Sequence, residues 1–306
     1  MKIFLISAIL IFSSIGFITI FPLVINSSES LMASPSIPSN NADVAGVQVY
    51  NIPPVSKNIP IPNLSARSVL VMDLDSEATL YQRESQTKLP IASTTKIMTA
   101  LVASKYFQQN SVLTVNEGAK AGGANVGLNT GDKLIFRSLL YGMLLSSGND
   151  AAFVIAENYP GGVSGFVSAM NEEVLTLKLQ NTHFDNPAGF DSPKHYSSAG
   201  DLYKITREAL KDANLAKIFA TKDTEILSID KKRKFSLHNL NKLLTSVTGV
   251  MGVKTGHTEL SKENLVTLVN RDNKKVLMVV LGSNDRFGES TSLIEWTYKN
   301  YQWSTD

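Results

Sequence analysis

The chain reads Leu89-Pro90-Ile91-Ala92-Ser93-Thr94-Thr95-Lys96-Ile97-Met98-Thr99-Ala100 at the point that decides its fold. After the proline, apolar residues recur at helical spacing, which predicts a helix over residues 94–106 that Ser93 opens. Ser93 and Lys96 are then neighbours on one face of the first turn. An alcohol is a poor nucleophile without an adjacent base, and a buried lysine that loses its proton can act as one. The stretch predicts either a reactive Ser93 with Lys96 as its base or a helix-capping serine.

A second short motif, Ser147-Gly148-Asn149, follows further along the chain. Beside a reactive serine, Ser147 can relay a proton to a leaving amine, and Asn149 can hold Lys96 and a substrate amide. Taken alone, such a tripeptide is more often a turn followed by a helix cap. Its weight comes from its position after the Ser93–Lys96 pair.

The third motif is Lys254-Thr255-Gly256. Lys254 can bring a second cation close to Lys96, and a neighbouring cation favours the neutral amine. Lys254 and Thr255 also suit a substrate carboxylate, and Gly256 lets a substrate backbone lie close to the strand. Alone, this tripeptide is more often a strand end and turn. Three such motifs in this order are poorly explained by chance.

Together the motifs resemble those of the serine acyl-transferases that include penicillin-binding proteins and class A β-lactamases. The resemblance is closer to the low-molecular-mass, serine-type D-alanyl-D-alanine carboxypeptidases of the β-lactamase/DD-peptidase superfamily. It extends over residues 66–303, nearly everything after the N-terminal region. Apart from the stretch quoted first, it rests on Ser68–Asp73, Leu144–Ala152, Asn181–Phe184, Asn186–Gly189, Tyr196–Ala199 and Gly252–Thr258.

The resemblance implies a role for each site residue. Ser93 is the acylated nucleophile and Lys96 its general base, while Ser147 and Asn149 complete the proton-relay group. The residues expected to bind substrate are Lys254, Thr255, Gly256, His257 and Arg286. His257 is expected to contribute its backbone N–H, with that of Ser93, to an oxyanion hole, its side chain being a spectator. Arg286 either helps to bind the carboxylate or is a plain surface arginine.

The same resemblance implies an α/β fold, in which an antiparallel sheet is flanked by helices and joined to a mainly helical subdomain. The active site is expected between the two parts, with Lys254 on an edge strand. The residue pattern independently predicts strands over 68–74, 78–82, 264–270 and 275–281, and a closing helix over 289–301. Between 136 and 220 helical patterns dominate.

Two departures from the family pattern stand out. Relatives usually carry Ala-Gly a few residues after Lys-Thr-Gly, and here the corresponding pair is Ser261-Lys262, which puts the geometry of that turn in doubt. Many relatives also have a second β-rich domain and an amphipathic C-terminal anchor, whereas this sequence ends at Asp306. We expect the N-terminal segment to provide the anchoring instead.

The first part of the chain indicates export. Residues 1–25 begin with Lys2 and continue as a long apolar run, which predicts a signal peptide or an uncleaved membrane anchor. Residues 26–65 are rich in Ser, Pro and Asn and are expected to be an extended linker, part of which can lie against the body. The catalytic domain is then expected over 66–306, on the extracytoplasmic face of the cell membrane, in the periplasm or cell wall.

Composition excludes several other classes. The 306 residues include no cysteine, so disulfides, thiolate catalysis and cysteine metal sites are ruled out. The four histidines lack the spacing of a helical zinc pair, and we expect neither a metal nor another cofactor. The net charge is only +2 and the basic cluster over 231–234 is short, so no nucleic-acid partner is expected.

The predicted reaction is removal of the terminal D-alanine from peptidoglycan stem peptides ending in D-Ala-D-Ala, through an acyl-enzyme that β-lactam antibiotics would also form. A DD-endopeptidase, a β-lactamase and a catalytically silent wall-binding scaffold remain alternatives. The β-lactamase is disfavoured because no Glu-x-x-Leu-Asn lies between the second and third motifs. A phosphate-binding loop at 252–255 is excluded because Val253 occupies the place of the required glycine.

Overall fold

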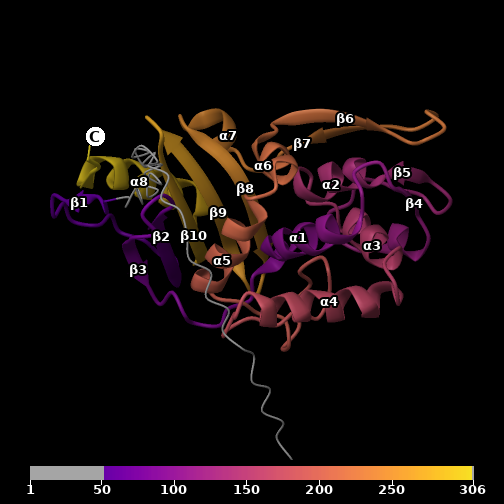
Figure 1. Cartoon of the computed structure of the whole chain (residues 1–306), viewed down its shortest axis with the longest axis horizontal. Helices are drawn as coiled ribbons and strands as arrows, with labels where there is room; N and C mark the ends of the chain where they lie inside the picture. Colours follow the sequence, from indigo (N-terminus) through magenta and orange to yellow (C-terminus); the bar gives the residue numbers. More distant parts are fainter. Residues whose placement is uncertain (1–51, 305–306) are drawn as a thin grey trace, which may run out of the picture. The chain divides into compact units, whose positions relative to one another are not determined.

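A computed structural model describes residues 52–304 of the chain. The predicted signal peptide or anchor and the linker up to residue 51 lie outside the described residues, so the division into anchor, linker and catalytic domain stays a prediction. No helix within 52–304 combines the length and the apolar character needed to cross a bilayer. The predicted fold class is confirmed, because an antiparallel sheet covered by helices adjoins a mainly helical region (Figure 1).

The central sheet is antiparallel, with strand order β3-β2-β10-β9-β8. Apolar residues alternate along its middle strands: in β2, Val69 and Val71 pack against one hydrophobic cluster, and Leu70 and Met72 pack against another. Because other elements cover both faces of the sheet, residues that point to either face are apolar, and the sequence of such a strand is a continuous apolar run. The strands are Ser68–Asp73 (β2), Thr79–Arg83 (β3), Val250–Thr258 (β8), Lys262–Arg271 (β9) and Lys274–Ser283 (β10).

A tight hairpin joins β9 to β10, two of the strands that the sequence predicted. Asp272 and Asn273 both have positive φ, at 50° and 59°, which is the conformation of a two-residue type I′ turn. Lys254 lies on β8, and β8 is an edge strand of the sheet, which confirms the expected position of the third motif.

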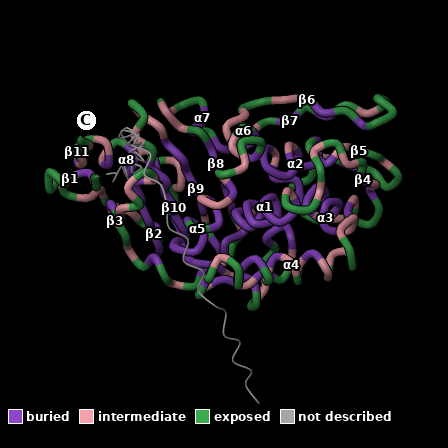
Figure 2. The backbone as a smooth tube through the Cα atoms, in the orientation of Figure 1, coloured by how far each residue is buried: buried purple, intermediate pink, exposed green. Residues whose placement is uncertain are grey.

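Helix α8 covers one face of the sheet, and α5 and α1 lie on the other (Figure 1). In α1 every residue from 96 to 103 is buried, so this helix forms the centre of the molecule (Figure 2). A helix buried on every side is expected to be mostly apolar, and the exceptions within residues 96–103 are Thr99 and Lys96. The helices are Lys96–Tyr106 (α1), Phe136–Leu144 (α2), Asn149–Glu157 (α3), Gly162–Thr176 (α4), Ala199–Ala209 (α5), Ala213–Ala220 (α6), Leu243–Ser246 (α7) and Arg286–Asn300 (α8), with short 3₁₀ helices at Ala92–Thr95 (η1) and Glu117–Lys120 (η2).

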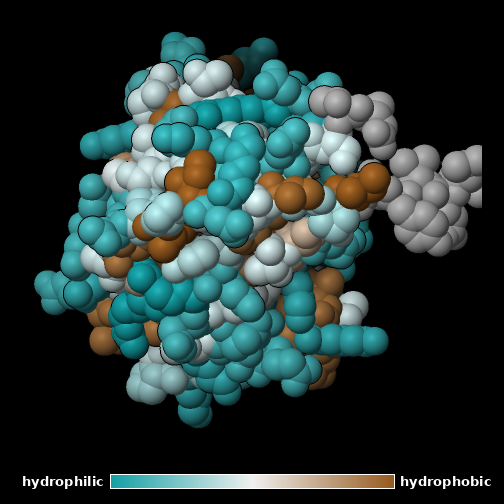
Figure 3. Space-filling view, turned by 90° about the vertical axis from the view of Figure 1, so that its left-hand side faces the viewer, coloured by the Kyte–Doolittle hydropathy of each residue, from teal (hydrophilic) through white to brown (hydrophobic). Residues whose placement is uncertain are grey.

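Within residues 52–304, three small two-stranded sheets complete the fold. One pairs β1 with β11, so that part of the predicted linker lies against the domain, where Ile61 and Leu64 also pack on the core. The side that carries α8 and β1 is mostly hydrophilic, with hydrophobic residues in separate small groups (Figure 3). The remaining strands are Val55–Ser56 (β1), Val112–Thr114 (β4), Lys133–Ile135 (β5), Asp223–Leu227 (β6), Lys234–His238 (β7) and Tyr301–Gln302 (β11).

Candidate active site

Ser93 lies in a tight 3₁₀ turn rather than in the first turn of the α-helix, which begins at Lys96. The prediction that Ser93 opens the α-helix is therefore wrong in this detail. The hydroxyls of Thr94 and Thr95 donate to the carbonyls of Ile91 and Ala92, at 2.7 and 2.8 Å, and so tighten the turn. The three-residue spacing still serves its purpose, because Lys96 Nζ lies 3.0 Å from Ser93 Oγ.

The Lys96 amine is enclosed by three oxygen atoms. Besides Ser93 Oγ, it contacts Asn149 Oδ1 and the backbone carbonyl of Ala188, each at 2.7 Å. A neutral amine has two N–H donors and one lone pair. The amide and carbonyl oxygens can only accept, so they take both N–H groups and leave the lone pair facing the Ser93 hydroxyl. This geometry presents Lys96 as a base to Ser93.

Burial favours that neutral form. The Lys96 side chain is fully buried, and its pKa is held well below the ordinary lysine value, first by burial and then by the cation of Lys254. The carboxylate of Asp150 acts in the opposite direction and raises the pKa. Lys254 therefore has the electrostatic effect on Lys96 that the sequence predicted.

Ser147 and Lys254 form a second pair. Lys254 Nζ donates to Ser147 Oγ at 3.0 Å and to the carbonyl of Thr255 at 3.1 Å. Burial, and then the Arg286 cation, lower the pKa of Lys254 to about 7. Ser147 has a φ of 58°, in the left-handed region, at the turn that leads into α3. The Ser147 hydroxyl therefore lies beside the buried Lys254 amine, which loses its proton more readily than an ordinary lysine because its pKa is lowered.

Gly256 allows β8 to approach the serine turn. A Cβ on this residue would lie 2.9 Å from the carbonyl oxygen of Ile91 and 3.2 Å from the backbone nitrogen of Ser93. Since such contacts are tighter than side chains accept, glycine is required for the strand to lie this close. The backbone at residue 256 therefore borders the Ser93 N–H directly.

The remaining predicted substrate-binding residues are Thr255 and His257 on β8 and Arg286, which contacts β8. Thr255 is buried, whereas the His257 side chain is exposed. Arg286, at the start of α8, donates from Nη1 to the carbonyl of Gly256 at 3.0 Å, and burial lowers its pKa. The structure thus brings Arg286 to the strand of the third motif.

Comparison with known proteins agrees with this geometry. The profile of the peptidase S11 family, described as D-alanyl-D-alanine carboxypeptidase, matches residues 55–285. The D-alanyl-D-alanine carboxypeptidase DacF of Bacillus subtilis is 33% identical over 246 residues, which cover 78% of this chain and 63% of the relative. The chain belongs to the D-alanyl-D-alanine carboxypeptidase family. A second relative, the D-alanyl-D-alanine carboxypeptidase of Streptomyces sp. strain K15, is 31% identical over 78% of this chain and 88% of that protein.

A solved structure shows the same fold. The crystal structure of the Streptomyces K15 DD-transpeptidase superposes with a TM-score of 0.75 at 30% identity, covering 79% of this chain and 100% of that one. The family resemblance inferred from the three motifs is therefore confirmed. The chain spans 63% of the length of the Bacillus relative, so the described domain corresponds to a part of that protein.

Two hydrogen bonds close the turn at Ser261-Lys262, where the sequence departs from the family pattern. The Ser261 hydroxyl accepts the Thr258 N–H at 3.0 Å, and the Thr258 hydroxyl accepts the Ser261 N–H at the same distance. Lys262 has a φ of 54°, where relatives usually have glycine. Left-handed backbone costs a residue with a side chain roughly 1–2 kcal/mol. The reciprocal hydroxyl bonds offset part of that cost.

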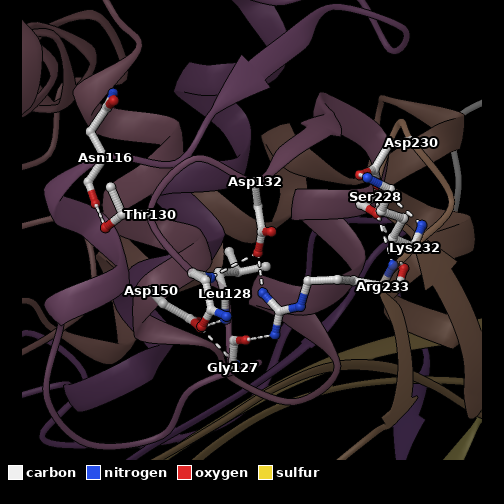
Figure 4. A network of polar contacts seen from close by, with 11 residues as sticks. Asn116, Gly127, Leu128, Thr130, Asp132, Asp150, Ser228, Asp230, Lys232 and Arg233 are labelled. Carbon is white, nitrogen blue, oxygen red and sulfur yellow. Dashed lines mark hydrogen bonds and ion pairs between the residues drawn. The ribbon is translucent and has the colours of Figure 1, made fainter.

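Asp150 is a site residue that the motif analysis did not assign. Its buried carboxylate accepts the backbone N–H groups of Val126, Gly127 and Leu128 at 2.8–3.0 Å (Figure 4). The loop that it holds also accepts the Asn149 amide, through the Gly122 carbonyl at 2.7 Å. Asp150 thereby fixes the loop against which Asn149 is oriented. The available signal was its place directly after the second motif.

The same loop is held from the other side by the hairpin of β6 and β7. Arg233 donates to the carbonyl of Gly127 at 2.6 Å and pairs with Asp132 (Figure 4). The basic cluster over 231–234 therefore includes one arginine with a structural role, and its lysines are exposed.

We expect Asp150→Asn to lower the free energy of unfolding by about 2–3 kcal/mol, because hydrogen bonds to a charged acceptor are lost and the new NH₂ group faces backbone N–H donors. Chemical denaturation measures this. Glu172, exposed on α4 and changed to Gln, is the control, with an expected effect within about 0.5 kcal/mol. Equal stability of the two variants would contradict the role given to Asp150.

Proposed function

We propose that this chain is a serine-type D-Ala-D-Ala carboxypeptidase that removes the terminal D-alanine from peptidoglycan stem peptides. The observation that carries the proposal is the Lys96 amine, buried and with both of its neutral-state N–H groups accepted, 3.0 Å from Ser93 Oγ. Family membership supports the substrate class, since both relatives named above are D-alanyl-D-alanine carboxypeptidases.

Acylation begins when Ser93 Oγ attacks the carbonyl carbon of the penultimate D-alanine and its proton passes to Lys96 Nζ. The developing oxyanion is stabilised by the backbone N–H groups of Ser93 and His257, which Gly256 allows to lie close together. When the C–N bond breaks, Ser147 Oγ delivers a proton to the leaving amine and is itself resupplied from Lys254 Nζ at 3.0 Å. Water then attacks the ester carbonyl: one of its protons passes through Ser147 Oγ to Lys254, and Lys96 returns its proton to Ser93 Oγ as the C–O bond of the ester breaks.

Specificity for a free C-terminus follows from charge. Lys254, Thr255 and Arg286 gather at β8, where a substrate carboxylate would be neutralised by two basic side chains. A bound carboxylate raises the pKa of Lys254 from its value of about 7 and so favours its protonated form. An internal peptide bond lacks that carboxylate and binds less well, which favours carboxypeptidase over endopeptidase activity.

The test is incubation of the purified chain with a pentapeptide that ends in D-Ala-D-Ala, followed by mass analysis. Release of one D-alanine supports the proposal. Absence of D-alanine release rejects it in favour of the silent scaffold, and cleavage of cross-linked dimers alone rejects it in favour of the endopeptidase. An amine added to the assay reports transpeptidation, the activity named for the Streptomyces K15 structure.

We also propose that β-lactams acylate Ser93 and that the enzyme acts outside the cytoplasm, held at the membrane by its N-terminal segment. Labelling with a fluorescent penicillin measures the first point. Slow release of the label from the enzyme fits a carboxypeptidase, and rapid hydrolysis of the penicillin would identify a β-lactamase. Fractionation of cells that produce the full chain measures the second, and recovery in the cytosol would contradict it.

A further inference from the structure

A buried histidine that the mechanism does not use lies behind the serine turn. His195 is buried, with only 3% of its surface exposed. Its Nδ1 accepts the backbone N–H of Asp185 at 3.1 Å, so this nitrogen carries no proton. The neutral ring therefore has its proton on Nε2, which lies 2.7 Å from the hydroxyl of Thr95.

The Thr95 hydroxyl leads to the same tautomer. Its own proton is donated to the carbonyl of Ala92 at 2.8 Å, so it must accept from the histidine. Ala92 directly precedes Ser93 and has a φ of 47°, in the left-handed region that costs a residue with a side chain roughly 1–2 kcal/mol. A chain of two hydrogen bonds thus runs from His195 to the strained residue beside the nucleophile.

His195 also contacts the loop of residues 185–190. Asn186 Oδ1 in this loop accepts the backbone N–H groups of Ala188, Gly189 and Phe190, at 2.7–3.1 Å. The loop then presents the Ala188 carbonyl to Lys96 at 2.7 Å. Gly189 packs so closely on the serine turn that a Cβ would lie 2.0 Å from the Ala92 oxygen.

One imidazole ring therefore joins the loop that supplies an acceptor to the base and the turn that carries the nucleophile. We propose that His195 is a positioning residue, whose neutral ring holds Ser93 and Lys96 in their reactive geometry through the Thr95 hydroxyl and the Asp185 backbone. This inference rests on the proposed function. A displacement of about 1 Å between reacting groups can cost a hundredfold in rate.

The ring must stay neutral for this role, because a proton on Nδ1 would face the Asp185 N–H. Burial lowers the pKa of His195 to about 4, and any positive charge on His183 or Lys96 acts in the same direction. The Asp185 carboxylate opposes them and raises the pKa. The ring is therefore neutral at neutral pH.

The test compares His195→Gln with His195→Phe. Glutamine can accept from Asp185 and donate to Thr95, whereas phenylalanine fills the space and does neither. We expect the rate constant for Ser93 acylation by a fluorescent penicillin to fall about 10- to 100-fold in His195→Phe and to stay within about threefold in His195→Gln. Equal loss in both variants, or no loss in His195→Phe, overturns the proposal.

A second variant guards against misfolding of the first. Thr95→Val keeps the branched shape of the side chain and replaces the hydroxyl with a methyl group. We expect it to slow acylation about tenfold, and the double variant with His195→Phe to be no slower than the slower single variant, because both break one chain. Fully additive losses overturn the proposal. A wild-type protein that takes no label would instead reject the proposed function.

The neutral state of the His195 ring can be tested separately, through the pH dependence of stability. An unfolded histidine has a pKa of roughly 6.5, so between pH 6.5 and 4 the unfolded chain binds a proton that the folded chain does not. Acid in this window therefore favours unfolding of the wild type more than of His195→Gln. We expect the melting temperature of the wild type to fall further than that of His195→Gln between pH 6.5 and 4.5. Parallel falls would overturn the neutral-ring assignment.

Discussion

Ser93→Ala is expected to release no detectable D-alanine from a D-Ala-D-Ala pentapeptide and to take no label from a fluorescent penicillin. In the proposed mechanism the ester forms on Ser93 Oγ, which lies 3.0 Å from Lys96 Nζ, so this substitution removes the nucleophile. The fold should survive, because the turn is held by the hydroxyls of Thr94 and Thr95 and not by that of Ser93. Product analysis, gel fluorescence and a thermal melt measure the three expectations.

The matched control for this variant is Ser246→Ala, which removes an exposed serine hydroxyl at the end of α7. It should release D-alanine and take the label at the wild-type level. Persistent labelling of Ser93→Ala would mean that another nucleophile carries the acyl group, and the assignment of the first motif would then be wrong. Loss of both activities in a variant that melts like the wild type supports it.

Much of the fold was predictable because its signals are local. Val69 to Met72 alternate between two covered faces, and Asp272-Asn273 is a turn that both residues tolerate at positive φ. The hairpin of β6 and β7 was not predicted. Its strands expose most of their residues and carry charged side chains, so they have neither a long apolar run nor a helical period.

Some residues of the candidate site could likewise be predicted from the sequence, and others could not. Side chains with special chemistry, such as Ser93 and Lys254, can be recognised in the sequence from their residue types and from the order of the motifs that contain them. The role of the Ala188 carbonyl could not be predicted in this way. Every residue has a backbone carbonyl, and only the folded loop brings that of Ala188 to Lys96. Asp150 and His195 lay within or beside stretches that carried the family resemblance, but their roles depend on backbone partners that no motif specifies.

Lys96→Gln is expected to lower the acylation rate constant by roughly a thousandfold or more, since general-base catalysis alone contributes about 10²–10⁴. Glutamine can keep hydrogen bonds to Asn149 and Ala188 but has no basic nitrogen. Lys96→Arg should be equally slow, because the guanidinium is always protonated and cannot accept the Ser93 proton. Stopped-flow measurement of penicillin acylation gives the rate constants. Lys105→Gln, on the same helix and half exposed, is the control and should acylate like the wild type.

The pH dependence distinguishes a base from a merely structural lysine. As the proposed base, Lys96 would act only when neutral, so wild-type acylation should rise with pH through the pKa of Lys96, which lies well below the ordinary 10.5. This acid limb should be absent from Lys96→Gln. In Asp150→Asn it should move to lower pH, because the carboxylate that raises the pKa of Lys96 is gone. An unchanged acid limb in Lys96→Gln would show that a different group takes the proton, and the three-oxygen enclosure of this amine would then need another explanation.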